Sequence, residues 1–324
     1  MGERAATVRW GIVGCGDVTE VKSGPGFQKA DGSALVAVMR RDRAKAEDYA
    51  RRHSVPRAYD DADALIGDSE VDAVYIATPP STHLDLARRV AAAGKPCLVE
   101  KPMAMTHAEC VQMVDAFRER GVPLWVAYYR RALPRFLKVR ELLTGGAIGR
   151  PTSVDVLIKE PLASGETLRN WRFNPAISGG GLFLDLGSHC VDLLDFFLGP
   201  IEEVHGISAN TAGAYAADDV TVMACRFPGG ALGIGTWNFN ADEKADSMTF
   251  IGSAGVLVTP VFSDADIVVT RAGRHETFAA RNPPHVHQPL IQSIVDELRG
   301  RGRCESTGDS GARASWVLDC CYSR

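Results

Sequence analysis

The sequence predicts an α/β protein with two domains, an N-terminal doubly wound parallel sheet and a C-terminal α+β domain with a mainly antiparallel, open sheet. Three observations support this. Apolar strands alternate with helical segments over residues 1–127. A glycine-rich turn directly follows the first strand. Beyond about residue 150, strands follow one another through glycine-rich turns. We place the boundary between residues 127 and 128.

Five apolar segments define the first domain. The predicted strands are residues 7–16, 34–39, 71–80, 96–102 and 123–129, and the predicted helices are residues 43–53, 82–95 and 106–121. Asp42 is suited to cap the first of these helices, and Gly94 to close the second. Because the strands are continuously apolar and separated by helices, they predict a parallel sheet covered on both faces.

The turn "GIVGCGDVTE" matches G-x-G-x-x-[GA] at Gly14 and Gly16, with Thr19 where a third small residue belongs. Gly14 permits a sharp turn, and Gly16 lets backbone amides approach a pyrophosphate. The helix start at Asp17 and Val18 favours the negative charge of that group. A tight turn without a ligand is the alternative. The position between a strand and a helix favours a dinucleotide site.

The helix after this turn is interrupted by "KSGPG", residues 22–26. Pro25 lacks a backbone donor, and its glycine neighbours favour irregular backbone. We therefore expect a loop over the nicotinamide end of the site, with Lys22 near it.

The end of the second strand, "VMRRDR", indicates which dinucleotide is bound. NAD-binding strands end in an acidic residue that pairs with the ribose 2′-OH. Here Arg40 and Arg41 occupy that place, and Asp42 is better used as a helix cap. Two guanidinium groups suit a 2′-phosphate, so we predict NADP rather than NAD. A solvated basic helix start is the alternative.

The segment "VEKP" ends a buried strand on Glu100 and Lys101. Ligands of doubly wound sheets bind outside the carboxyl ends of the strands, so both side chains are predicted to face the cofactor cleft. A surface ion pair at a strand end is the alternative.

The second half reads as a series of strands with few helices between them. The predicted strands are residues 153–159, 203–209, 220–227, 231–239, 247–252 and 255–259, with an amphipathic helix at 289–300 and a short tail helix near 314–320. One face of such a sheet can serve as an interface.

Residues 182–199, "LFLDLGSHCVDLLDFFLG", are apolar nearly all round, which predicts a buried helix. Asp185, Ser188, His189 and Asp192 interrupt the pattern at helical spacing and therefore line one face. Polar groups satisfied within the core are the alternative. We interpret Asp192 as structural.

The composition sets limits on function. The 324 residues carry a formal net charge of −4, which gives no reason to expect nucleic acid or a membrane surface as a partner. None of the eight cysteines forms a C-x-x-C pair, so we expect a reduced, cytoplasmic protein and no metal site. No apolar run reaches the length of a membrane span.

The glycine turn, "VEKP" and "GGGLFLDLGSHCVDLLDFFLG" together resemble the glucose–fructose oxidoreductase/inositol dehydrogenase (Gfo/Idh/MocA) family over essentially the whole chain. The resemblance implies an NADP-binding Rossmann domain over 1–127 and a substrate-binding and oligomerisation domain over 128–324. It implies a homodimer or homotetramer formed through the C-terminal sheet. The Arg40–Arg41 pair resembles NADP-using members such as dihydrodiol dehydrogenases and anhydrofructose reductases.

The resemblance also assigns residues. The catalytic lysine of the family corresponds to Lys101, and its aspartate and histidine to Asp185 and His189. It places Thr78 and Pro79 against the nicotinamide riboside, followed by His83.

The chemistry follows from these side chains. A proton must leave or reach the substrate oxygen when a hydride moves, and the unperturbed pKa of a histidine lies near neutrality, so His189 is the natural proton carrier. Asp185 can orient the imidazole, and Lys101 can hydrogen-bond the same oxygen.

Five further residues are candidates for substrate contacts, with hinge packing, loop anchoring or surface charge as the alternative: Lys22, Tyr128, Arg130, Trp171 and Arg172. His287 has a weaker claim.

These inferences predict an NADP(H)-dependent oxidoreductase acting on a carbinol or carbonyl carbon of a sugar-like or cyclic polyol substrate. A non-catalytic NADP-binding sensor on the same fold, or an imine or diene reductase, is the alternative.

Overall fold

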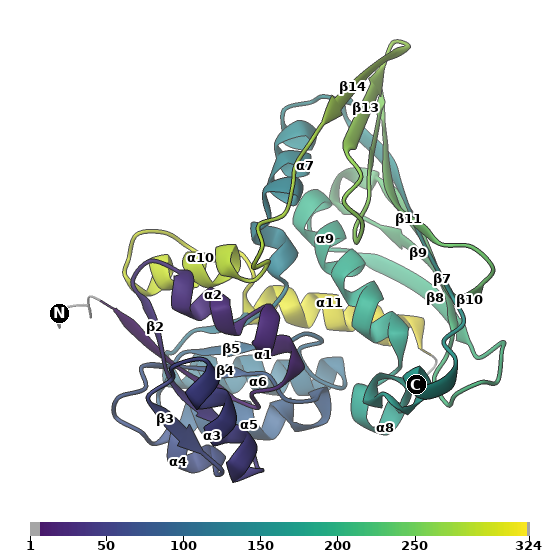
Figure 1. Ribbon diagram of the computed structural model, residues 1–324. Helices are drawn as coiled ribbons and strands as arrows, with labels where there is room; N and C mark the ends of the chain where they lie inside the picture. Colours follow the sequence, from purple (N-terminus) through teal and green to yellow (C-terminus); the bar gives the residue numbers. More distant parts are fainter. Residues whose placement is uncertain (1–6, 323–324) are drawn as a thin grey trace. The chain divides into compact units, whose positions relative to one another are not determined.

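The computed structural model describes residues 7–322, which fall into two compact units (Figure 1). The first unit comprises the chain up to Ala132 together with Pro283–Ala312, and the second comprises Leu133–Asn282 with the chain from Arg313 onward. The return of residues 283–312 to the first unit differs from a single boundary at residue 127. The functional division into residues 1–127 and 128–324 stays a prediction.

The first unit is built on a six-stranded parallel sheet of order β3-β2-β1-β4-β5-β6, which confirms the predicted doubly wound sheet. Its strands are β1 (Val8–Val13), β2 (Ser33–Met39), β3 (Arg57–Tyr59), β4 (Ala73–Ile76), β5 (Cys97–Val99) and β6 (Leu124–Val126). β3 is short and only half-buried, and the hydrophobic pattern did not reveal it.

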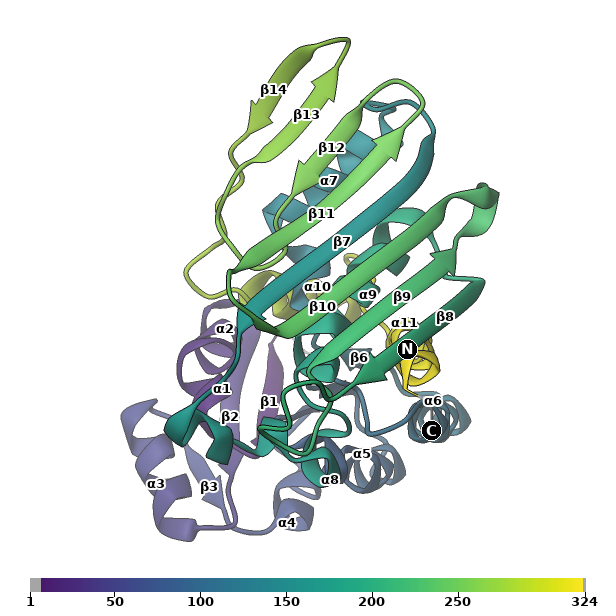
Figure 2. The same cartoon turned by 90° about the vertical axis from the view of Figure 1, so that its right-hand side faces the viewer.

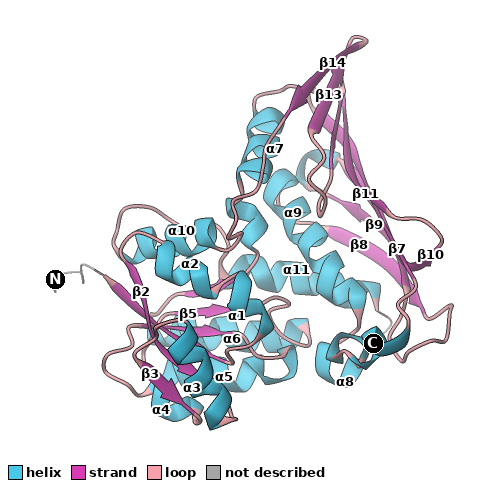
Figure 3. Cartoon of the chain, viewed as in Figure 1, coloured by secondary structure: helices cyan, strands magenta, loops and turns pink. Residues whose placement is uncertain are grey.

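Helices cover both faces of this sheet (Figure 3). They are α1 (Asp17–Val21), α2 (Gly24–Lys29), α3 (Arg43–Arg52), α4 (Ala62–Ile66), α5 (His83–Ala92), α6 (His107–Arg120) and α10 (Gln288–Leu298), with short turns η1 (Pro80–Thr82) and η2 (Tyr129–Ala132). Right-handed crossovers place the helices between β1 and β3 on one face and those between β3 and β6 on the other. α10 packs against α2 and η2.

The predicted break after the glycine turn is present, but the expected loop is a second short helix. α1 ends at Val21, and α2 begins at Gly24 with Pro25 in its first turn. Proline is tolerated there because the first backbone N–H groups of a helix have no intrahelical acceptor. A Cβ on Gly26 would lie 2.8 Å from Cδ1 of Ile291, so this glycine permits the close contact between α2 and α10.

The second unit contains an eight-stranded sheet of order β14-β13-β12-β11-β7-β10-β9-β8 (Figure 2). Every neighbouring pair is antiparallel except β7 and β10, which confirms the mainly antiparallel prediction. The strands are β7 (Pro151–Pro161), β8 (Glu203–Ala209), β9 (Val220–Arg226), β10 (Leu232–Ala241), β11 (Ala245–Gly252), β12 (Val256–Thr259), β13 (Ile267–Arg271) and β14 (Arg274–Phe278). The last two were not predicted.

One face of this sheet is covered by helices. Phe183 packs on Trp237 of β10 with ring centroids 4.8 Å apart, and Phe197 packs on Phe250 of β11 at 5.6 Å. The helices and helical turns are α7 (Pro134–Thr144), η3 (Gly165–Arg169), η4 (Trp171–Phe173), α8 (Pro175–Ser178), η5 (Phe183–Gly187), α9 (Ser188–Leu198), η6 (Pro228–Gly230) and α11 (Gly308–Cys321), the last shared between the two units.

The predicted helix over residues 182–199 is not uniform. η5 is a π-helical turn that leads directly into α9. A Cβ on Gly187 would collide with the ring of Phe183, so the glycine leaves room for that ring one turn earlier. π-turns widen a helix locally and occur often at functional sites. Asp185 lies inside this turn. The direction of its side chain therefore differs from the one that a regular helix of 3.6 residues per turn would give.

No helix among residues 7–322 combines the length and the apolar character needed to cross a bilayer.

Candidate cofactor site and catalytic residues

The first unit gathers the predicted cofactor residues at one edge of its sheet. β1, β4, β5 and β6 are parallel, so their carboxyl ends lie together. The glycine turn follows β1, Thr78 follows β4, Glu100 and Lys101 follow β5, and Tyr128 follows β6.

Gly14 is required by the close approach of two loops. Its φ of +93° is disfavoured for residues with a Cβ. An added Cβ would also lie 2.5 Å from Cγ2 of Thr78 and 3.1 Å from its backbone nitrogen. The glycine therefore lets the turn after β1 contact the segment after β4.

Three backbone donors of the turn are already engaged. The N–H of Gly16 donates to Oγ1 of Thr19 at 2.9 Å, so it is already engaged. Gly14 and Cys15 both donate to the carbonyl of Met39. The N–H groups of Asp17 and Val18, in the first turn of α1, have no intrahelical acceptor.

The turn nevertheless fits a dinucleotide. A Cβ placed on Gly16 would have no neighbour within 4 Å, so the space above this residue is open to a ligand's phosphates. Because α1 has only five residues, the local N–H groups of Asp17 and Val18, rather than a helix dipole, would bind that group.

Two guanidinium groups stand at the end of β2. Arg40 and Arg41 are both exposed, and Nη1 of Arg40 lies 3.5 Å from the carbonyl oxygen of Cys15. The carboxylate of Asp42 accepts the N–H of Lys45 at 3.3 Å as the predicted helix cap. The acid nearest to the end of β2 is therefore engaged.

His83 is fully buried and joins two loops of the site. Its Nε2 lies 2.8 Å from the carbonyl oxygen of Thr78, and its Nδ1 lies 3.1 Å from that of Met103. Burial lowers the pKa of the imidazole. Both nitrogens face backbone carbonyls, so the side chain holds the segment of Thr78 and Pro79 in place. The role of His83 in cofactor binding stays a prediction.

Glu100 is buried behind Lys101. It accepts a hydrogen bond from the hydroxyl of the fully buried Tyr75, and its Oε2 accepts the backbone N–H of Lys101 at 3.0 Å. Burial raises the pKa of Glu100, whereas the hydroxyl of Tyr75 and the charges of Lys101 and Lys22 oppose that rise. Burial and the neighbouring carboxyl group hold the pKa of Tyr75 well above its usual value.

The predicted substrate residues of the first unit differ in exposure. Lys22 is exposed at the end of α1, Tyr128 is fully buried, and Arg130 is buried. Nη1 of Arg130 donates to the hydroxyl of Tyr129 at 2.6 Å. The ring of Tyr129 stacks on that of His287 with centroids 4.4 Å apart.

In the second unit, Asp185 is held by Arg172. Nε of Arg172 donates to Oδ2 of Asp185 at 3.0 Å, and both side chains are partly exposed. The two residues were predicted in separate roles, and the structure brings them together. The guanidinium of Arg172 also lies 4.5 Å from the ring centroid of Trp171.

His189 is buried at the start of α9, beside Phe262 with ring centroids 6.3 Å apart in an edge-on arrangement. The loop carrying Phe262 is fixed by Asp246, whose carboxylate accepts the N–H groups of Val261, Phe262 and Ser263 at 2.8, 2.8 and 2.6 Å. These three hydrogen bonds hold the loop in the position that brings Phe262 beside the imidazole of His189.

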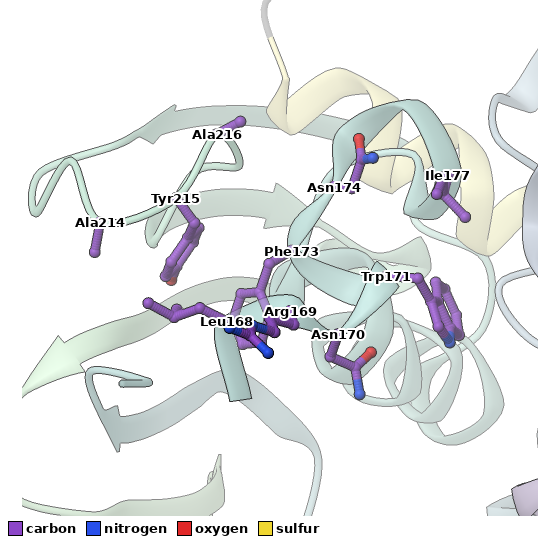
Figure 4. A pocket seen from close by; sticks show the side chains of 10 residues that line it. All are labelled: Leu168, Arg169, Asn170, Trp171, Phe173, Asn174, Ile177, Ala214, Tyr215 and Ala216. Atoms are coloured by element: carbon purple, nitrogen blue, oxygen red, sulfur yellow. The ribbon is translucent and has the colours of Figure 1, made fainter. Parts of the chain in front are cut away.

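A cavity of about 600 Å³ lies beside η4 in the second unit (Figure 4). Phe173 and Tyr215 meet in it with ring centroids 4.8 Å apart, and Trp171 extends to the other side of η4 in the view of Figure 4. Its lining residues are Leu168, Arg169, Asn170, Trp171, Phe173, Asn174, Ile177, Ala214, Tyr215 and Ala216. The aromatic and amide side chains suit a polar, ring-shaped ligand.

The predicted catalytic set is divided between the units. Lys101 belongs to the first, and Asp185 and His189 belong to the second. Their joint action is a proposal.

Sequence reasoning overlooked Tyr75, Tyr129 and Phe262, and gave His287 little weight. A tyrosine inside the continuously buried strand β4 was a usable signal, because a buried hydroxyl requires a partner. The contact of His287 with Tyr129 joins residues far apart in the chain, and no local sequence pattern indicates it.

Comparison with known proteins places the chain among oxidoreductases. Residues 8–128 match the family described as "Oxidoreductase family, NAD-binding Rossmann fold", and residues 136–258 match the "GFO/IDH/MocA C-terminal domain". The chain is 39% identical over 315 residues to "Oxidoreductase P35" of Formosa agariphila, covering 96% of this chain and 97% of that protein. It is 27% identical to the 1,5-anhydro-D-fructose reductase of Ensifer adhaerens over 96% of this chain and 93% of that protein.

The fold is also that of a solved enzyme. The structure of an aldose-aldose oxidoreductase from Caulobacter crescentus, complexed with glycerol, superposes with a TM-score of 0.86 at 23% identity, covering 98% of this chain and 96% of that one. The motifs, the two sheets and these matches agree, and the chain belongs to the Gfo/Idh/MocA family of oxidoreductases.

Proposed function

We propose that the protein is an NADP(H)-dependent oxidoreductase that acts on a carbinol or carbonyl carbon of a sugar-like or cyclic polyol substrate. The placement of Lys101 carries this proposal: it follows β5 at the carboxyl edge of the sheet, and its backbone is held by the buried Glu100. The name of the Ensifer adhaerens relative, an anhydro-sugar reductase, supports the substrate class.

The preference for NADP rests on the end of β2. Arg40 and Arg41 are exposed there, and the carboxylate of Asp42 is engaged as a helix cap. A 2′-phosphate accepts charge-assisted hydrogen bonds from guanidinium groups, whereas a free ribose diol needs an acceptor such as a carboxylate.

A bound nicotinamide dinucleotide supplies hydride transfer. In the proposal, His189 exchanges a proton with the substrate oxygen, and Lys101 donates a hydrogen bond to it. Asp185, held by Arg172, orients and balances the imidazole when it becomes charged. The ring of Phe262 lies edge-on to the imidazole of His189 and restricts its rotation.

Assembly and location complete the proposal. Ile207 and Val222 face each other across β8 and β9 on the exposed side of the second sheet, and Leu232 and Ile234 are exposed on β10. We propose that this apolar surface forms a homodimer or homotetramer.

All eight cysteines are free, and seven are buried, which supports a cytoplasmic location.

The proposal is tested by an NADP⁺ reduction screen over sugars, inositols, uronates and trans-dihydrodiols, with NADPH oxidation over the matching carbonyls, imines and dienes. Turnover of a polyol or sugar derivative that is lost in Lys101→Ala, with NADPH binding retained, is expected. Tight NADPH binding without turnover across the panel would support a sensor instead, and turnover confined to imines or dienes would support the other alternative.

A further inference from the structure

The segment that returns to the first unit after the second sheet brings a histidine to Glu100. His287 immediately precedes α10, and its carbonyl accepts the N–H of Ile291 at 3.0 Å. The position of α10 is fixed by its contact with α2 at Gly26. The backbone of His287 is therefore anchored at the start of a helix that packs against α2.

The ring of His287 is held in one plane. Only 2% of the residue is exposed, and the ring stacks on that of Tyr129 at an interplanar angle of 28°. Tyr129 is itself fixed, because its hydroxyl accepts a hydrogen bond from Arg130. Such a stacked ring can present Nδ1 in only a narrow range of directions.

Nδ1 of His287 lies 3.9 Å from Oε1 of Glu100, and among residues 7–322 it has no hydrogen-bond partner. An unsatisfied buried nitrogen is costly, so a native fold that keeps one calls for a functional explanation. Hydrogen bonds of catalytic sites are often long in the free enzyme and shorten in the complex. Oε1 of Glu100 is the acceptor placed for such a bond.

Burial and the charges around the imidazole favour its neutral form. Burial, followed by the positive charges of Lys22, Lys101 and Arg130, lowers the pKa of His287 to about 3. The neutral ring carries one N–H. The tautomer that carries this hydrogen on Nδ1 directs it at the carboxyl group of Glu100. Because the ring is neutral, it adds no positive charge beside the three cations.

We infer that His287 is a positioning residue for the Glu100–Lys101 pair: its neutral Nδ1–H is directed at Oε1 of Glu100 and holds the carboxylate so that Oε2 binds the backbone N–H of Lys101. The role rests on the proposed function, because Lys101 is the residue that meets the substrate. Tyr75 is the second donor to Oε1, and Lys22 and Lys101 supply the nearby charges that face Glu100. Loss of the imidazole therefore removes one donor that is directed at the carboxyl group of Glu100.

The test compares His287→Leu, which removes the N–H, with His287→Asn, whose amide can place an N–H near the position of Nδ1. His275→Leu, at an exposed position on β14, is the control. We expect kcat of His287→Leu to fall about tenfold, the loss typical of one hydrogen bond to a charged group. The acid limb of its kcat profile should move to higher pH by about 0.5–1 unit, because Glu100 is then protonated more easily. His287→Asn should restore most of both properties.

A second readout needs no turnover. Infrared difference titration of the carboxyl groups, with Glu100→Gln to assign the band, should show Glu100 protonating at higher pH in His287→Leu than in the wild type or in His275→Leu. An unchanged titration overturns the inference, as do equal losses in the Leu and Asn variants accompanied by a lowered Tm. Absence of turnover in the wild type contradicts the proposed function, and the titration then still decides the role of His287.

Discussion

Nε of Arg172 donates a 3.0 Å hydrogen bond to Oδ2 of Asp185 and so ties η4 to the π-turn η5 that begins the buried helix. Asp185 is therefore held from outside its own helix. In the proposed function Asp185 balances a charged imidazole, and this restraint orients its carboxylate before the substrate arrives.

Arg172→Ala should lower kcat/KM about tenfold without unfolding the protein, because one charge-assisted hydrogen bond to a partly exposed carboxylate is lost. Arg172→Lys should recover only part of the activity, since lysine cannot reproduce the geometry of a guanidinium group. Steady-state kinetics measure both. Arg274→Ala, at an exposed position on β14, is the control, and an equal loss there would contradict a specific role for Arg172.

The double variant Arg40→Asp with Arg41→Ala should weaken NADPH binding by about 100-fold or more, because two cations that we propose bind the 2′-phosphate are removed and a like charge is introduced. NADH binding should change much less. Fluorescence titration of the two cofactors measures both constants. Equal weakening of the two would contradict the assignment of NADP.

Two glycines of the first turn should respond differently to alanine. Gly14→Ala places a Cβ at a φ of +93° and 2.5 Å from Thr78, so we expect a loss of about 2–4 kcal/mol in the free energy of unfolding. Gly16 has an extended φ of −165° and open space above it, so Gly16→Ala should keep its stability and lose cofactor affinity. Urea unfolding and cofactor titration separate the two effects. Loss of stability in Gly16→Ala would count against this explanation.

Glu20 should make part of the stability depend on pH. Its carboxylate accepts hydrogen bonds from Arg52 at 2.7 and 2.8 Å and lies 2.7 Å from Nε2 of His53, and these contacts lower its pKa from 4.5 to about 2. A lowered pKa in the folded state stabilises the protein above about pH 4.5, and this stabilisation is lost as the pH falls toward 2.

The stability difference between wild type and Glu20→Gln should therefore be largest at pH 6 and shrink at pH 4 and pH 3. Urea unfolding at the three values measures it. Glu47→Gln, which removes an exposed ion pair with Arg43, is the control and should show little change. A difference that stays constant from pH 6 to pH 3 would show that the Glu20 carboxylate is not the source.

The exposed side of the second sheet should control assembly. Ile207 and Ile234 are 70% and 58% exposed, so Ile207→Lys with Ile234→Lys should shift the protein toward the monomer by placing charges in an apolar contact. Light scattering after size exclusion measures the mass. Leu137→Lys, which changes an exposed apolar residue of α7, should leave the mass unchanged. A wild type that is already monomeric would rule out this interface.

Part of this structure could be predicted element by element. The strands after which Gly14, Arg40 and Lys101 stand were recognised because a buried parallel strand is continuously apolar. Asp42 and Gly94 marked helix ends correctly, since capping depends on a few neighbouring residues. The short β3 and the exposed β14 were missed, because such strands carry a weak hydrophobic pattern. β13 was also overlooked, although its buried Ile267 and Val269 alternate with more exposed residues.

By itself, the sequence determined which functional side chains follow which strand. The glycine turn follows β1, the arginines follow β2, and Glu100 and Lys101 follow β5. It also determined the polar stripe of α9. These features depend on residues adjacent in the chain. Only the tertiary structure decided that Gly14 approaches Thr78, that Arg172 holds Asp185, and that α10 brings His287 to Glu100. Such contacts depend on how whole helices and strands pack together. The periodicity of the sequence indicates only which side of each element is buried.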